Sequence, residues 1–132
     1  MLASALSPTY DLSPALRHVS GRAYALYSPH DPVLGIGTRM FGTIDGVKTD
    51  AAGRVGFTIP PGTGDARQYE KLTQIGYDPS WIRLSNIGDH IGPMMRPFAR
   101  EILSPLLRTG FLRQIADAAT RPAATTTTSE PG

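Results

Sequence analysis

The stretch Arg22-Ala-Tyr-Ala-Leu-Tyr-Ser-Pro-His-Asp-Pro-Val-Leu-Gly35 decides the fold that we expect for this chain. Within it, residues 23–27 form a short apolar and aromatic run that carries no charge, as in a buried strand. Pro29 and Pro32 then end the strand, because proline fixes φ and cannot donate to a sheet. Asp31 is therefore held just past a core strand. Ligands and catalytic groups collect at the carboxyl ends of strands in open α/β sheets, so Asp31 is a candidate site residue.

Composition excludes several classes of protein. The chain has 132 residues, of which 40% are hydrophobic and 18% charged, as in a soluble globular domain. The 13 Lys and Arg against 11 Asp and Glu are scattered, so we expect no nucleic-acid partner. The absence of cysteine excludes disulfides, and the histidines show no metal-ligand spacing, so we expect neither metal nor cofactor. No apolar run approaches ~18 residues and no signal peptide is recognisable, which leaves the compartment open.

Periodicity predicts an α/β fold. A helix over 32–41 fits the Asp-Pro pattern, in which an N-cap precedes proline at the first helical position. The last helix carries an apolar stripe and contains Pro105, so we expect a kink or a break near Ser104. Residues 42–68 are the least regular, and a hairpin over the mouth of the site is one interpretation. The expected strands are 1–6, 22–27, 55–59 and 81–87, and the expected helices are 11–17, 32–41, 66–75 and from 93 onward, weakly extended over 112–119.

A glycine cluster at residues 35–42 invites a nucleotide-binding interpretation, but its spacing is wrong. The dinucleotide fingerprint would need glycine at the position of Met40. A phosphate loop would need Gly-Lys-Ser/Thr, whereas Thr43 and Ile44 follow Gly42. We therefore expect no nucleotide site.

A histidine lies in a setting similar to that of Asp31. Gly88, Asp89 and His90 follow the strand expected over 81–87. An acid and a histidine at the carboxyl ends of two parallel strands can meet. The carboxylate then accepts a hydrogen bond from one ring nitrogen, and the other ring nitrogen takes a proton from a hydroxyl nucleophile. The sequence therefore predicts that Asp31 and His90 are the acid and the base of a Ser-His-Asp triad.

Simpler interpretations stand beside this one. Asp31 also fits a plain helix N-cap, and His90 also fits a loop histidine without catalytic function. Asp89 could replace Asp31 as the acid, but adjacent residues rarely present their side chains to each other, which favours a turn role for Asp89. His30 either lines the site or faces solvent, and we expect His18 to be exposed.

The order of nucleophile, acid and histidine along the chain is that of the α/β-hydrolase family. Tyr24–Asp31 resembles the penultimate core strand and acid loop of that family. Leu84–His90 resembles its last core strand and histidine loop, and the amphipathic helix from about Pro93 resembles its final helix. Leu2–Ser7 would be the strand before the acid strand.

The resemblance covers about residues 1–108 and implies a serine hydrolase, esterase-like or lipase-like, that acts on a small ester or related acyl substrate. It implies a partial parallel sheet with flanking helices over 1–115, the C-terminal half of an α/β-hydrolase-like fold, followed by a disordered Ala/Thr-rich tail over 116–132. Two features depart from the family. Ser28 replaces a common glycine, and neither the Gly-x-Ser-x-Gly elbow nor an oxyanion-hole loop occurs in the sequence.

We therefore expect the nucleophile to come from a missing N-terminal half. The alternative is a non-catalytic, truncated α/β module that pairs with another chain through an open sheet edge at Leu2–Leu6.

Overall fold

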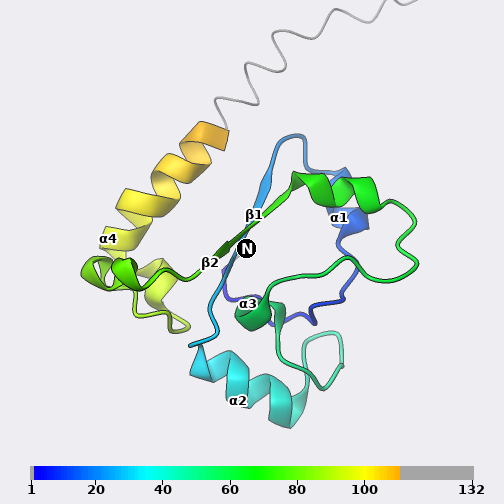
Figure 1. Cartoon of the computed structure of the whole chain (residues 1–132), viewed down its shortest axis with the longest axis horizontal. Helices are drawn as coiled ribbons and strands as arrows, with labels where there is room; N and C mark the ends of the chain where they lie inside the picture. Colours follow the sequence, from blue (N-terminus) through cyan, green and yellow to red (C-terminus); the bar gives the residue numbers. More distant parts are fainter. Residues whose placement is uncertain (1, 111–132) are drawn as a thin grey trace, which may run out of the picture.

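The computed structural model describes residues 2–110, which form a mixed α/β structure with short helices around a small parallel sheet (Figure 1). The helical extension expected over 112–119 and the tail expected over 116–132 lie outside the described residues.

The sheet has two parallel strands, β1 (Ala23–Tyr27) and β2 (Leu72–Gly76). Leu26 of β1 lies opposite Ile75 in β2 and also forms a parallel bridge with Leu2. The strand expected over 22–27 is thus confirmed and lies between two parallel neighbours. The strand expected over 1–6 is reduced to this single bridge.

The expected last strand is wrong. Residues 81–87 do not form a strand, because Pro79–Leu84 form the 3-10 helix η2. The Asp78 side chain accepts a 2.7 Å hydrogen bond from the Ser80 amide at its start, and Pro79 occupies its first turn. This capping signal overrides the alternation of apolar residues that follows it.

The expected helix over 66–75 is wrong in its second half. Ala66–Lys71 form the 3-10 helix η1, and β2 begins at the next residue. The apolar spacing of this segment fits a helix locally, but β1 offers a row of backbone donors and acceptors that need a partner. Pairing with β1 decides the conformation.

Two expected helices are confirmed. Helix α2 (Pro32–Phe41) begins after its N-cap Asp31 and ends before Gly42, whose φ of 86° lies in the region that favours glycine. Helix α1 (Ser13–Arg17) begins two residues later than the expected range of 11–17, and Leu12 is its N-cap. Asp11 takes over part of the capping role and accepts a 2.9 Å hydrogen bond from the Ser13 amide.

Residues 51–57 belong to the core. The expected strand over 55–59 is absent, and helix α3 (Ala52–Val55) occupies the start of this stretch. The Ala52 amide donates to the Leu6 carbonyl and the Gly53 amide donates to the Ser4 carbonyl, each at 2.8 Å. This part of the 42–68 segment is therefore tied to the N-terminal residues and does not form a hairpin over the site.

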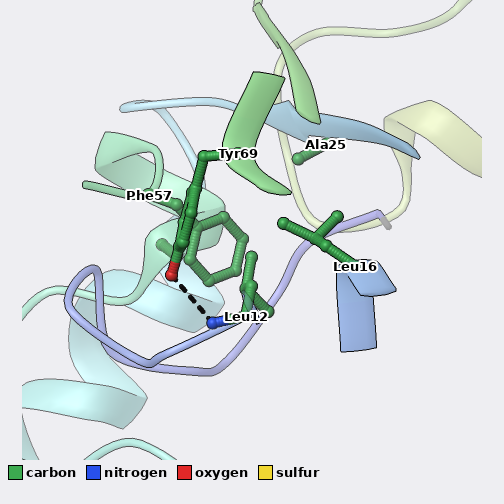
Figure 2. Packing of buried hydrophobic residues seen from close by; sticks show 6 residues of the cluster. Leu12, Leu16, Ala25, Phe57 and Tyr69 are labelled. Carbon is green, nitrogen blue, oxygen red and sulfur yellow. Dashed lines mark hydrogen bonds between the residues drawn. The ribbon is translucent and has the colours of Figure 1, made fainter. Parts of the chain in front are cut away.

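The two faces of β1 contribute to two separate apolar clusters. Ala25 belongs to the cluster near α1, α3 and η1 (Figure 2), and Leu26 belongs to the one near η2 and helix α4 (Arg96–Phe98). Helices α1 and α4 lie on opposite sides of the sheet (Figure 1). The buried members are Leu12, Leu16, Ala25, Ala52, Phe57 and Tyr69 in the first cluster, and Leu26, Leu84 and Phe98 in the second.

The final helix does not break. The short 3-10 turn η3 (Gly92–Met94) and α4 lead into the π-helical turn η4 (Ala99–Leu103), after which α-helix continues over residues 104–110. Pro105 cannot donate to the carbonyl of Glu101, and its ring crowds that turn. A wider π turn just before Pro105 is one way in which a helix accommodates such a residue.

Candidate active site

The structure brings together the two candidate site residues. His90 Nδ1 lies 2.9 Å from Asp31 Oδ2. The Asp31 residue is only 2% exposed, whereas the His90 side chain is 34% exposed. A buried carboxylate against one ring nitrogen leaves Nε2, on the opposite side of the imidazole, to meet another group.

The backbone around Asp31 fixes the direction of its carboxylate. The Asp31 amide donates to the Ser28 carbonyl at 3.3 Å, and its carbonyl accepts from the Gly35 amide at 3.1 Å. Oδ1 accepts a 3.0 Å hydrogen bond from the Leu34 amide in the first turn of α2. With Oδ1 engaged by the helix, Oδ2 is the oxygen that faces His90, so Asp31 caps α2 and contacts His90 at the same time.

The histidine loop does not follow a strand directly, contrary to the prediction. β2 ends at Gly76, and the helix η2 intervenes before His90 is reached. The sequence therefore predicted the contact between His90 and Asp31 on a wrong premise, since His90 does not follow a strand directly. It meets Asp31 because η2 folds the chain back against the sheet, where Leu84 packs with Leu26 and Phe98.

Asn86 and Asp89 shape the loop that carries His90. Asn86 is 1% exposed, and its Oδ1 accepts a 2.9 Å hydrogen bond from the Gly88 amide. Asp89 Oδ1 accepts a 2.7 Å hydrogen bond from the Gly92 amide, so Asp89 has the turn role expected for it. Asn86 was missed by sequence reasoning, although an Asn two residues before a glycine is a recognisable turn signal.

Gly88 meets a steric need in this loop. Its φ is 82°, and a Cβ at this position would lie 2.9 Å from Ser28 Oγ. The histidine loop therefore passes close to the acid loop, and the absence of a side chain permits that approach.

Of the other histidines, His30 adjoins Asp31 in the chain and lines the same groove as Asp31. The His30 ring packs edge-on against Tyr77, with 5.6 Å between ring centroids, and its amide donates to Ser28 Oγ at 3.2 Å. His18 is exposed, as expected.

A groove of about 400 Å³ opens beside Asp31 along the start of α2. Ile36 and Met40 line it and are more than half exposed. Arg39 lies at the same groove. This size falls in the range of sites for small molecules. The lining combines these apolar side chains with charged or polar ones, among them His30 and Arg54.

The described part of the chain lacks two features that would indicate other kinds of function. Residues 2–110 contain no cluster of three or more histidine or carboxylate side chains that could hold a metal ion. Within the same range, no helix has both the length and the apolar character needed to cross a membrane.

Comparison of the chain with protein-family models, with curated proteins and with solved structures finds no match. The class that the structure itself defines is a mixed α/β protein with a small parallel sheet. The resemblance to the α/β-hydrolase family stays a prediction.

Proposed function

We propose that this chain is the C-terminal part of a serine hydrolase of the α/β-hydrolase family and supplies the acid, Asp31, and the base, His90, of a Ser-His-Asp triad. One observation carries the proposal. A buried carboxylate at the carboxyl end of a parallel strand lies 2.9 Å from the Nδ1 atom of a partly exposed imidazole.

The pair can perform general base and then general acid catalysis. Asp31 holds the His90 tautomer whose proton is on Nδ1, and it stabilises the imidazolium once that forms. His90 Nε2 takes the proton of a serine hydroxyl as its oxygen attacks the ester carbonyl carbon. Nε2 then gives the proton to the leaving alcohol, and water releases the acyl group by the same route.

Small acyl esters are the substrate class that we propose. The groove beside Asp31 presents Ile36 and Met40, against which an acyl chain would bury apolar surface. Burial of Asp31 also favours the chemistry, because the electrostatic interaction with a developing imidazolium is stronger away from water.

We place the nucleophile in a polypeptide segment that precedes these 132 residues. The sequence contains no Gly-x-Ser-x-Gly elbow, and in the family the nucleophile comes before the acid. The single Leu2 bridge beside β1 supports this placement, because a sheet can extend past it by further parallel strands.

The test begins with the DNA upstream of Met1, which we expect to encode Gly-x-Ser-x-Gly in the same frame. The longer product should hydrolyse short-chain aryl esters, and His90→Ala should lower kcat by roughly 10⁴-fold or more. His18→Ala is the matched control, because His18 is exposed and lies apart from the pair. Equal rates for the wild type and His90→Ala would refute the catalytic role.

A second function is supported by the sheet edge. Leu2 is 38% exposed and makes one bridge, so the backbone at Leu2 can accept a strand from another chain. The edge does not extend to Leu6, because the Ser4 and Leu6 carbonyls already accept from the Gly53 and Ala52 amides. A stop codon directly before Met1, with no Gly-x-Ser-x-Gly sequence encoded upstream in the same frame, would favour this non-catalytic pairing module over the hydrolase.

A further inference from the structure

Arg54 lies at the end of α3, against the carboxyl end of β1, and its side chain is 21% exposed. Its Nη2 donates a 2.7 Å hydrogen bond to the Pro29 carbonyl, and its Nη1 donates a 2.9 Å hydrogen bond to Asp50 Oδ1. One planar guanidinium thus joins the acid loop to an anion outside it, a geometry that arginine permits and lysine does not.

The Pro29 carbonyl is an informative contact, because it lies two residues before the acid. The loop from Ser28 to Pro32 contains two prolines, which have no N–H to donate. Its internal hydrogen bonds run to Ser28, from the His30 and Asp31 amides at 3.2 and 3.3 Å. The Arg54 contact ties this loop to α3.

The same guanidinium lies on the first turn of α2, on the other side of the acid. A Cβ built at Gly35 would be 3.0 Å from Arg54 Nη1 and 3.3 Å from Nε. Nε is buried and has no hydrogen-bond partner. Arg54 therefore contacts the chain both before Asp31, at Pro29, and after it, at Gly35.

Asp50 holds the guanidinium in this place. Its carboxylate pairs with Arg54 at 2.9 Å and with Arg39 at 2.9 and 3.0 Å. The hydrogen bond from Arg39, with the charges of Arg39 and Arg54, outweighs the effect of burial and lowers the pKa of Asp50 below its ordinary value of 3.8. Asp50 is thus an anion at neutral pH.

We propose that Arg54 is a positioning residue for the Asp31–His90 pair, acting by clamping Pro29 and Gly35 on either side of the acid. The catalytic meaning of this clamp rests on the proposed function, but the clamp itself is a property of the chain. Catalytic constellations require positional precision of about 0.5 Å, so slack in the acid loop would separate Oδ2 from Nδ1.

The experiment uses ¹⁵N NMR of the full 132-residue chain at alkaline pH, where imidazoles are neutral. The ring-nitrogen shifts report which His90 nitrogen carries the proton. In the wild type we expect the proton on Nδ1, donated to Asp31, and in Asp31→Asn we expect this preference to be lost. In Arg54→Gln the ratio of the Nδ1–H to the Nε2–H tautomer should fall by roughly fivefold to tenfold, as expected when one hydrogen bond is weakened.

Arg39→Gln is the matched control, because Arg39 shares the Asp50 partner and, within residues 2–110, donates its side-chain hydrogen bonds to Asp50 alone. We expect Arg39→Gln to leave the His90 signals at their wild-type positions. If disturbing Asp50 were enough to shift them, Arg39→Gln would shift them too. Wild-type His90 signals in a folded Arg54→Gln chain, or an equal change in Arg39→Gln, would overturn the proposal.

Arg54→Lys decides the outcome if Arg54→Gln does not fold. An ammonium group can reach Pro29 or Asp50 but cannot bridge them as a fork does, so we expect an intermediate tautomer ratio. A wild-type ratio in Arg54→Lys would overturn the two-sided clamp. Failure of the longer product to hydrolyse esters would refute the hydrolase function and leave this tautomer result unaffected.

Discussion

Asp31 performs two tasks with its two carboxylate oxygens. Oδ1 caps α2 through the Leu34 amide, and Oδ2 contacts His90. The capping task requires only a side-chain oxygen, whereas stabilising an imidazolium requires a negative charge. The two tasks can therefore be separated by substitution.

Asp31→Asn should preserve the free energy of unfolding within about 0.5 kcal/mol, because Asn caps helices as well as Asp does. Asp31→Ala should lower it by about 1 kcal/mol, since the Leu34 amide loses its acceptor. In the longer product, Asp31→Asn should nevertheless lower kcat by roughly 10⁴-fold. Urea denaturation measures the first two effects, and the ester assay measures the third. Full activity in Asp31→Asn would assign Asp31 to capping alone.

Helix α2 contains two glycines that differ in their surroundings. Gly35 is covered by the Arg54 guanidinium, whereas a Cβ at Gly37 would meet nothing within 4 Å. From sequence, both weaken the helix by the same amount. In the structure, the guanidinium over Gly35 leaves little room for a side chain, whereas the described contacts leave room for one at Gly37.

Gly37→Ala should stabilise the chain by about 0.5–1 kcal/mol, because alanine restricts the unfolded chain and favours helix. Gly35→Ala should give no such gain and should destabilise the chain, because the new methyl group would displace a guanidinium held by Pro29 and Asp50. Urea denaturation of both variants is the measurement. A similar gain for both would show that Arg54 moves aside without cost.

Strand β2 and the helix η2 show how local patterns mislead. Trp81–Ile87 alternate as a strand does, and Tyr69, Leu72 and Ile75 are spaced as on a helix face. The structure has a helix over most of the first stretch and a strand over the end of the second. Short apolar segments are ambiguous by periodicity, so the Asp78–Pro79 cap decides one case and the backbone of β1 decides the other.

At the scale of the whole molecule, the N-terminal segment is held by residues far along the chain. The Ile44 amide donates to the Ala5 carbonyl at 3.0 Å, and the Thr58 amide donates to the Pro8 carbonyl at 2.8 Å. Between them, Asp45 accepts from the Ser7 amide at 2.8 Å and from the Ser7 hydroxyl at 2.5 Å. Ser7 is 2% exposed, so this carboxylate satisfies the polar groups of a buried residue.

The Asp45 contact should make stability depend on pH. Burial raises the pKa of Asp45, but the hydrogen bonds from Ser7 and Thr43 together outweigh it and lower the pKa below its ordinary value of 3.8. A lowered pKa in the folded state stabilises the chain above that ordinary value, and this stabilisation is lost as the pH falls through the lower folded pKa.

Urea denaturation at a series of pH values from about 6 down to about 3 should therefore show falling stability, more weakly in Ser7→Ala than in the wild type. Asp78, whose pKa is lowered by Ser80, contributes a similar slope, so Ser80→Ala is the comparison that separates the two. An unchanged slope in Ser7→Ala would show that the Ser7 hydroxyl does not set the pKa of Asp45.

The sequence alone determined α1, β1 and α2, because each depends on local signals such as prolines, caps and an uncharged apolar run. The contact of Asp31 with His90 depends instead on η2, which folds the chain back against the sheet. Only the tertiary structure decided where β2 lies, that α3 enters the core, and that Arg54 reaches Pro29. Strand pairing and a guanidinium contact between distant residues depend on which segments become neighbours. That information is carried by burial and backbone hydrogen bonding across the fold, not by the pattern within any one segment.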